Sequence, residues 1–345
     1  MLASRASLAR LRRLQCSPVP APRVQLGGAA VLAVLLLFPL RSTGSSFQPG
    51  YAGFSVRFKE EVNPYSVLGV FVLPEEALTL EIAAEDAARG PYTLDAAGGK
   101  VERLTETAWE WRAPKRPGLA AVRLVQQSSG REMTLHAFVM VPVGPDARQV
   151  KGYDLGQYPR KPFKGLPTYL PPRGFVEVTP ANKDVAVAPH FTLGQFVCKQ
   201  GLAFPKYLVL RERLLLKLEA LLSEVNEQGY RASTFTVMSG FRTPAYNRGL
   251  KNGEYSRHIY GDASDIFIDE DHDGVMDDLN RNGRSDLGDA EVLRGLFEAM
   301  AGRPGFQTFA GGLGLYDSTR YHGPYVHVDT RGYDARWGAG TATAR

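Results

Sequence analysis

The chain has 345 residues, which is longer than one average domain, so two domains are the natural expectation. Its composition, with 44% hydrophobic and 22% charged residues, is that of a globular protein and excludes a fibrous or disordered chain. The net charge is +5, but five arginines fall within the first 23 residues, so the excess indicates a targeting feature and no nucleic-acid-binding surface. These are Arg5, Arg10, Arg12, Arg13 and Arg23.

An uncharged apolar stretch, LGGAAVLAVLLLFPL at 26–40, follows these arginines. It has the length of a signal-peptide core and is shorter than the ~20 residues of a membrane-spanning helix. Residues 1–45 are therefore expected to be a basic leader with a signal or anchor segment that exports the rest to the periplasm or cell envelope. No clean A-x-A cleavage motif is visible, so an uncleaved inner-membrane anchor is an alternative, and a buried core helix is another. Cys16 lies in this leader, which leaves Cys198 as the single exported thiol and predicts no internal disulfide.

Residues 46–145 show short apolar-alternating runs separated by Gly and Pro, such as FSVRF, ALTLEIAA and MTLHAFVMVP. Regular short strands with such turns predict an all-β, immunoglobulin-like sandwich. Trp109 and Trp111 are expected on one face of a strand, as core. His136 alternates with apolar neighbours and is expected to be a strand residue, so this domain carries no catalytic cluster.

Residues 146–184 are proline-rich and are expected to form a polyproline-like connector, with Tyr153, Tyr158 and Tyr169 docking it on the next domain. Residues 185–345 are expected to form an α+β domain with a small antiparallel sheet and flanking helices. A leucine pattern predicts a helix over 208–228, ended by Gly229. Strands are predicted at 235–239, 266–267, 314–316 and 325–329.

Two segments of this second domain carry the residues that could do chemistry. They are SGFRTPAYNRGLKNGEYSRHIYGDASD at 239–265 and YHGPYVHVD at 321–329. His258, Asp265 and His327 offer two imidazole nitrogens and a carboxylate, which are ligands that zinc takes. A catalytic zinc site typically has three protein ligands, and the ion activates a water molecule in the open position. These three residues are therefore the predicted zinc ligands.

The motifs SGFRTPAYN, SRHxxGDAxDI and VHVD, in that order, resemble those of the zinc D-Ala-D-Ala carboxypeptidase-type peptidases of peptidoglycan, whose zinc site is hedgehog-like. The resemblance covers roughly 185–338, a little under half of the chain. It implies that His258, Asp265 and His327 hold zinc and that Arg242 lies in the substrate pocket.

In some members of that family the general base is a His two residues before the last zinc ligand, or a Glu three residues before it. This chain has Tyr325 and Pro324 at those places. His322, five residues before His327, is the first candidate for the base, because a His at that spacing occurs in some members. Asp329 is the second candidate, either as base or as the residue that orients His327.

Arg242 and Ser256 are expected on the substrate side of the site. The planar guanidinium of Arg242 suits a substrate carboxylate or a developing oxyanion, and a structural ion pair is the alternative.

An acidic insertion at 269–289, DEDHDGVMDDLNRNGRSDLGD, repeats after nine residues. D-x-D-x-D-G supplies hard oxygens on a sharply turning loop, as Ca²⁺ requires, and resembles the calcium loops of dockerins and thrombospondin repeats. A solvated acidic loop is the alternative. The predicted calcium ligands are Asp269, Asp271, Asp273, Asp277, Asp278, Asn280, Asn282, Asp286 and Asp289.

Together these features predict an exported zinc metallopeptidase that hydrolyses peptidoglycan stem peptides at or near D-Ala bonds, as carboxypeptidase or endopeptidase. One alternative is a catalytically inactive zinc- and calcium-binding module of the cell wall, since hedgehog-type domains keep the metal without catalysis. A calcium-dependent adhesion protein is another, but it leaves the SGFR and SRHxxGDAxD motifs unexplained.

Overall fold

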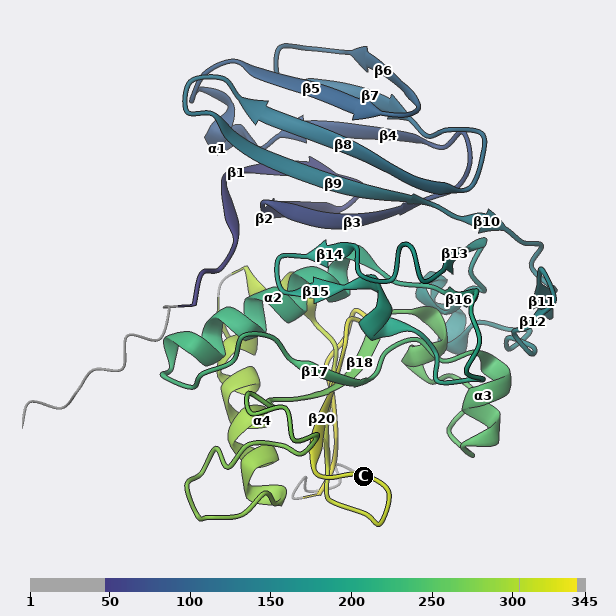
Figure 1. Cartoon of the computed structure of the whole chain (residues 1–345), viewed down its shortest axis with the longest axis vertical. Coiled ribbons are helices and arrows are strands. Elements are labelled where there is room, and N and C mark those ends of the chain that lie inside the picture. Colours follow the sequence, from purple (N-terminus) through teal and green to yellow (C-terminus); the bar gives the residue numbers. More distant parts are fainter. Residues whose placement is uncertain (1–46, 304, 340–345) are drawn as a thin grey trace, which may run out of the picture. The chain divides into compact units, whose positions relative to one another are not determined.

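The computed structural model of the chain describes residues 47–303 and 305–339. The predicted leader at 1–45, with its apolar segment and Cys16, lies outside the described residues. The described part is a strand-rich mixed α/β fold with several small sheets and few helices (Figure 1). Within this part, no helix combines the length and the apolar character needed to cross a membrane.

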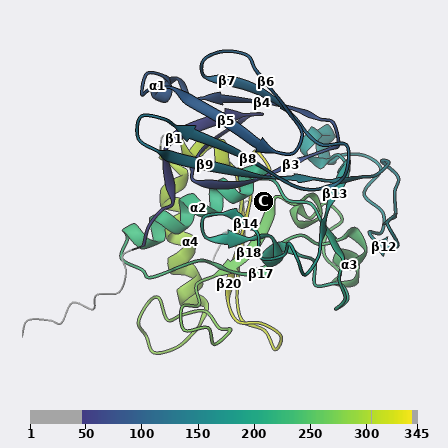
Figure 2. The same cartoon turned by 45° about the horizontal axis from the view of Figure 1, so that its top comes forward.

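Residues 51–139 fold into two sheets whose strands fall on the alternating apolar runs. The first sheet has the order β2 (Glu61–Tyr65), β1 (Tyr51–Phe58), β4 (Ala77–Ile82), β7 (Ala108–Arg112), β6 (Lys100–Arg103). The second has the order β3 (Val67–Val72), β9 (Arg131–Val139), β8 (Gly118–Gln126), β5 (Tyr92–Ala97), and only its β3–β9 pairing is parallel. The two sheets lie one over the other, with the short α1 (Ala84–Ala87) at one end (Figures 1 and 2). Their buried side chains, Trp109 and Trp111 included, belong to the hydrophobic core.

The segment 146–184 contains more regular structure than a polyproline connector. Its pieces are a hairpin of β11 (Gln149–Val150) and β12 (Tyr153–Asp154), the 3₁₀ turns η1 (Phe163–Gly165) and η2 (Pro167–Tyr169), and β13 (Gly174–Val178). Strand β13 is the middle of a three-stranded sheet between β10 (Val141–Pro142) and β16 (Lys206–Leu208). The tyrosines dock as predicted, since Tyr158 donates a hydrogen bond to the carbonyl of Ile259 at 2.8 Å and Tyr169 packs edge-on against Tyr260.

The long helix α2 (Glu212–Glu227) begins four residues later than the leucine pattern predicts. The reason is that Leu208 pairs with Val176 in the β13–β16 ladder, so the apolar residues ahead of the helix belong to a strand. Helix α2 is buried on nearly every side. Even the carboxylate of Glu212 is buried, where it accepts hydrogen bonds from the backbone N–H of Phe71 (3.0 Å) and from the ammonium group of Lys59.

A five-stranded sheet forms the centre of the second half of the chain. Its order is β17 (Thr236–Ser239), β18 (Ala263–Phe267), β20 (Tyr325–Asp329), β19 (Gly312–Tyr316), β21 (Ala335–Gly338). The first three pairings are antiparallel as predicted, whereas β21 pairs with β19 in parallel. This follows from the connection, because β21 reverses direction after β20 and then lies on the far edge of β19.

Two helices and several short elements complete this half. Helices α2 and α4 (Leu287–Ala301) contact each other, and Phe297 of α4 packs edge-on against Phe235, just before β17. The remaining elements are α3 (Pro244–Gly249), β14 (Ala186–Ala188), β15 (Phe191–Thr192), η3 (Leu193–Phe196), η4 (Arg257–Tyr260) and η5 (Phe306–Phe309). Thr192 caps the N-terminus of η3, as a capping box with Gln195.

Candidate metal centre

Three short elements bring the predicted zinc ligands together. His258 lies in the 3₁₀ turn η4, Asp265 lies on β18 and His327 lies on β20, directly opposite Asp265 in the strand register. The turn ends at Gly261, which has φ +75°, and a Cβ there would collide with the carbonyl group of Val209. Only glycine fits this close approach, so Gly261 sets how η4 enters the sheet.

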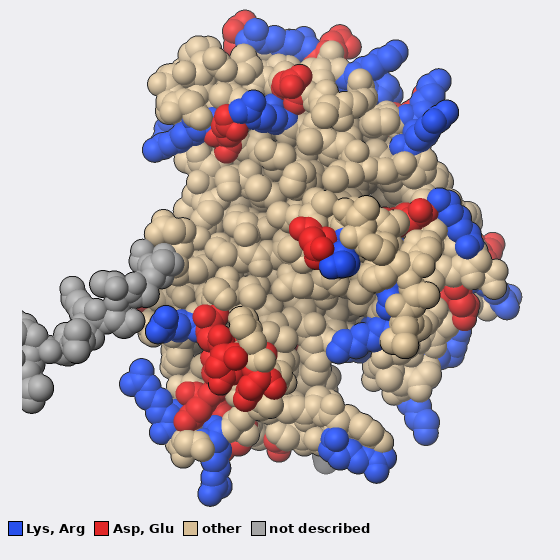
Figure 3. Space-filling model, viewed as in Figure 1, with Lys and Arg blue, Asp and Glu red and all other residues tan. Residues whose placement is uncertain are grey.

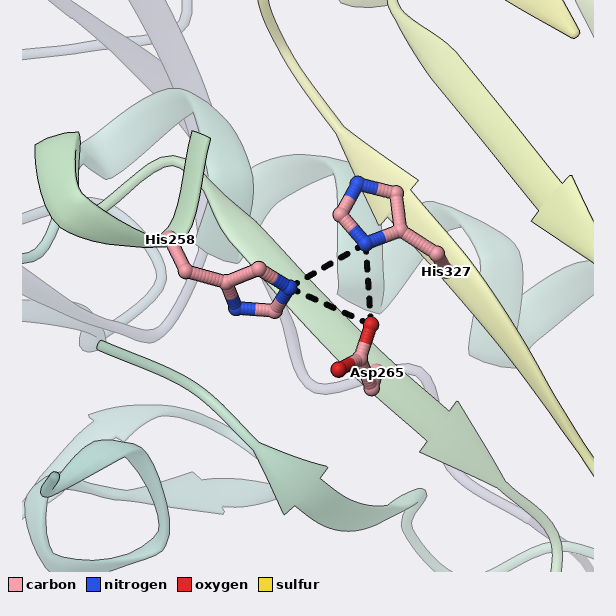
Figure 4. Close-up of side chains that lie close together, drawn as sticks. All are labelled: His258, Asp265 and His327. Carbon is pink, nitrogen blue, oxygen red and sulfur yellow. Dashed lines mark hydrogen bonds and ion pairs between the residues drawn. The ribbon is translucent and has the colours of Figure 1, made fainter. Parts of the chain in front are cut away.

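The ligand atoms of the three residues face one point (Figure 4). His258 Nε2 lies 3.2 Å from His327 Nδ1 and 3.2 Å from Asp265 Oδ1, and the latter two atoms are 2.9 Å apart. Ligands at zinc distances of about 2.0–2.1 Å in a tetrahedron stand about 3.3 Å from one another. The observed triangle therefore fits a small tetrahedral cation after slight expansion.

The outer nitrogens of both imidazole rings are already used. His258 Nδ1 donates to the carbonyl oxygen of Gly240 at 2.7 Å, and His327 Nε2 donates to Asp329 Oδ2 at 3.1 Å. In the neutral rings the proton sits on these outer nitrogens, so the two inner nitrogens each present a lone pair toward Asp265 Oδ1. Three lone pairs converge in a buried space, and a cation at their centre would relieve their mutual repulsion.

The electrostatics of the centre favour a deprotonated carboxylate. Burial raises the pKa of Asp265, but His258, His327 and Arg242 together outweigh it and hold that pKa well below its usual range. Burial lowers the pKa of His258 below its ordinary value, which keeps that ring neutral. Burial also lowers the pKa of His327, but its bonds to Asp265 and Asp329 outweigh this and raise it, so a proton and a cation compete for Nδ1.

Arg242 lies against the metal centre as an ion-pair partner. Its Nη2 forms a close ion pair with Asp265 Oδ2, the oxygen that does not face the histidines, and its Nε donates to Ser239 Oγ at 2.8 Å. The guanidinium thus orients Asp265. This arrangement corresponds to the structural ion pair that was the alternative interpretation of Arg242. Ser256, grouped with Arg242 as a substrate-side residue, precedes η4, and its side chain makes no capping bond to that turn.

Asp329 lies on the other side of the His327 ring from the three converging atoms. Its carboxylate is fully buried and also accepts from the backbone N–H of Gly312 (2.8 Å) and from Arg331 Nε (2.9 and 3.0 Å). Burial raises the pKa of Asp329, but His327 and Arg331 hold it well below its usual range. The geometry therefore favours the role of an orienting carboxylate for His327 over that of a base.

His322, the first candidate for the base, lies in the loop between β19 and β20. It is half-buried, its Nδ1 donates to the carbonyl oxygen of Gly323 at 2.8 Å, and its ring packs edge-on against Tyr325 at 5.1 Å. Nε2 is therefore the nitrogen that can accept a proton. The structure brings His322 to Tyr325 and does not bring it into contact with His258, Asp265 or His327.

The side chains that flank His327 on the β21 side are not among the site residues predicted from the sequence. The ring of Trp337 lies 5.1 Å from that of His327, and its indole N–H donates to the hydroxyl of Tyr316 at 2.8 Å. The sequence signal that could have revealed the position of Trp337 is the Gly-Leu-Gly segment of β19. Gly312 and Gly314 leave one face of the strand bare, as a bulky neighbouring side chain requires.

The acidic insertion repeats in its backbone as well as in its sequence. His272 and Arg281 have φ near +60°, and two residues later Gly274 and Gly283 have φ +82° and +83°. In each copy, the first Asp accepts from the backbone N–H groups of the fifth and sixth positions.

Oxygens of Asp269, Asp271 and Asp273 lie within 4.8 Å of one another. Figure 3 shows acidic side chains gathered in the region where Figure 1 labels α4. Two of the nine predicted ligands, Asp286 and Asp289, form a capping box on α4 and so accept backbone N–H groups. Asp277 accepts a hydrogen bond from the backbone N–H of Glu270. Asn280 and Asn282 form hydrogen bonds within the second loop, through their side-chain oxygens and their backbone N–H groups.

No protein-family model matches the chain, and no curated protein matches it.

Proposed function

We propose that this chain is a zinc metallopeptidase that hydrolyses peptidoglycan stem peptides at or near D-Ala bonds. The observation that carries the proposal is the convergence of lone pairs from His258 Nε2, His327 Nδ1 and Asp265 Oδ1 on one buried point. Two neutral imidazoles and one carboxylate are a donor set that suits zinc and leaves one coordination position for a reacting molecule. When bound there, zinc would lower the pKa of water and polarise a carbonyl group.

The chain's own residues would hold this arrangement rigid. Arg242 and Ser239 fix the orientation of Asp265, and Asp329 with Arg331 fixes that of His327. Such supporting bonds typically matter 10–100-fold in metal affinity or activity. His322 Nε2 is the proposed proton acceptor, because Nδ1 of the same ring already bonds to the carbonyl oxygen of Gly323.

The second candidate is a catalytically inactive zinc- and calcium-binding module of the cell wall. One observation favours it: the ring of His322 contacts Tyr325 and not the three metal ligands. The D-Ala peptidase stays the first proposal because the three motifs that resemble that family supply the whole converging cluster.

The rest of the chain is proposed to serve this activity at the cell envelope. We infer an immunoglobulin-like sandwich over 46–145, a connector over 146–184, and a peptidase domain over 185–345. The 1–45 leader would export the protein to the periplasm and, if uncleaved, anchor it in the inner membrane.

The insertion at 269–289 is proposed to bind Ca²⁺, because its two nine-residue copies share the same turns and the same bonds to their first Asp.

Digestion of purified muropeptides by the full chain, with zinc content measured alongside, tests the proposal. We expect release of D-Ala or opening of a cross-link by zinc-loaded protein, and loss of both after chelation. Full zinc occupancy without cleavage of any muropeptide would favour the binding module.

A further inference from the structure

The face of the five-stranded sheet that carries the metal centre continues beyond His327 to the edge strand. Gly314 of β19 lies directly opposite His327, and Trp337 of β21 lies beside Gly314 in register. A Cβ on Gly314 would come within 2.5 Å of the indole Nε1, so the indole ring lies flat over this glycine. Trp337 therefore occupies the metal-bearing face, immediately beside His327.

Tyr316 is held against this tryptophan. It follows Gly314 by two residues and so points to the same face of β19. Its ring stacks on that of Tyr325, with centroids 4.7 Å apart and planes within 9°, and its hydroxyl accepts the indole N–H of Trp337 at 2.8 Å. Because that indole nitrogen lies over Gly314, the phenol leans along the strand toward His327.

The hydroxyl of Tyr316 still has a hydrogen to donate. A phenol both donates and accepts, and the bond from Trp337 uses a lone pair of the oxygen. Among residues 47–303 and 305–339, no acceptor for the Tyr316 O–H is found. On the opposite side of the centre, Arg242 is tied to Asp265 and Ser239. The Tyr316 O–H is thus a free donor that the bond from Trp337 orients. Unlike Arg242, Tyr316 does not hold one of the proposed metal ligands.

We propose that Tyr316 is a catalytic residue whose O–H donates a hydrogen bond to the carbonyl oxygen of the scissile amide, with Trp337 as the residue that positions it. This inference rests on the proposed peptidase function. In that reaction the oxygen of water bonds to the carbonyl carbon, the C–N bond breaks, and both water protons end on the amine, giving a carboxylate and an ammonium group. Tyr316 keeps its proton throughout and stabilises the negative charge that develops on the carbonyl oxygen.

The test compares the full-length wild type with Tyr316→Phe at matched, measured zinc content. One readout is muropeptide cleavage, in which loss of a preorganised donor of this kind costs about 10²–10³ in kcat. The other is the calorimetric Kd of a phosphinate analogue of D-Ala-D-Ala, whose tetrahedral anion carries charge where the carbonyl oxygen develops it. We expect that Kd to rise about 10-fold to 100-fold, as for loss of a hydrogen bond to a charged group. Zinc content should not change, since Tyr316 touches none of the three ligands.

Two further variants sharpen the test. Trp337→Phe removes the indole N–H and should lower kcat more than it changes KM, because the phenol loses its positioning bond. Tyr325→Phe removes the neighbouring hydroxyl, which has no bond to fix it in the described chain, and should cost less than Tyr316→Phe. If Tyr316→Phe keeps kcat and phosphinate affinity within twofold of wild type, or if Tyr325→Phe carries the loss instead, the inference is overturned. If zinc-loaded wild type neither cleaves muropeptides nor binds the phosphinate, the proposed function fails together with it.

Discussion

Lys217 lies on α2, next to the sheet that carries Asp265 and His327, and replacing it should change how the stability of the protein depends on pH. Its ammonium group is buried on α2 and donates to the backbone carbonyls of Phe309 (3.0 Å) and Asp329 (2.8 Å), which ties β20 to the turn before β19. Burial lowers its pKa from 10.5 to about 8, against the attraction of Asp329. The pocket around it, about 200 Å³, is lined mostly by apolar side chains such as Phe297.

The sign of the resulting pH dependence follows from proton counting. Between pH 8 and 10.5 the unfolded chain holds a proton on this lysine that the folded chain has released, so folding becomes more favourable as pH rises. The fall of the Lys217 pKa from 10.5 to about 8 corresponds to about 3 kcal/mol in full, of which about 2 kcal/mol is gained between pH 7 and 9.5. Below pH 7 both states hold the proton and the cost of burying the charge is constant.

The assay is urea unfolding of metal-free wild type and Lys217→Met, followed by circular dichroism between pH 7 and 9.5. Other groups contribute equally to both proteins, so the difference in unfolding free energy isolates the lysine. We expect wild type to gain about 2 kcal/mol relative to the variant over this range. A difference that stays constant from pH 7 to 9.5 would refute the assignment of a depressed lysine pKa.

Other predictions concern the two proposed ion sites. Replacing any one of the three proposed zinc ligands by alanine should abolish stoichiometric zinc binding, measured by elemental analysis. The variants are His258→Ala, Asp265→Ala and His327→Ala. If a variant keeps full zinc occupancy, the residue replaced in it is not a zinc ligand. Asp329→Asn should weaken zinc binding about 10–100-fold in competition with a chelator, since His327 loses its orienting carboxylate, whereas unchanged affinity with lost activity would make Asp329 the base. Calcium at a hundredfold excess over its Kd should stabilise the fold by about 2.7 kcal/mol, and a melting temperature indifferent to calcium would contradict binding at 269–289.

The cluster of His258, Asp265 and His327 could be predicted from the sequence largely because two of its members lie at short spacing. His258 and Asp265 are seven residues apart on one turn and the strand that follows it, so local geometry alone brings them close. His327 is 62 residues beyond Asp265 and joins the cluster only through the β18–β20 register. Its assignment therefore depended on the resemblance of the VHVD motif to a family.

Neither the role of Arg242 nor the position of Trp337 beside His327 could be settled from residue types and spacing. A guanidinium suits a substrate anion and a structural carboxylate equally well, and only the fold shows that Asp265 Oδ2 is within its reach. Trp337 comes from a strand that pairs in parallel with β19, a non-local contact that no periodicity encodes. The start of α2 was missed for a similar reason, because Leu208 fits a helical apolar pattern but pairs with Val176.

Zinc-edge X-ray absorption of the full-length protein, with zinc stoichiometry measured on the same sample, is the direct test of zinc binding by His258, Asp265 and His327. We expect one zinc per chain at this centre, bound by two imidazole nitrogens, one carboxylate oxygen and at least one further oxygen from solvent, at about 2.0–2.2 Å. The imidazole scattering should be lost in His258→Ala. A first shell containing sulfur, or an unchanged spectrum in His258→Ala, would contradict it.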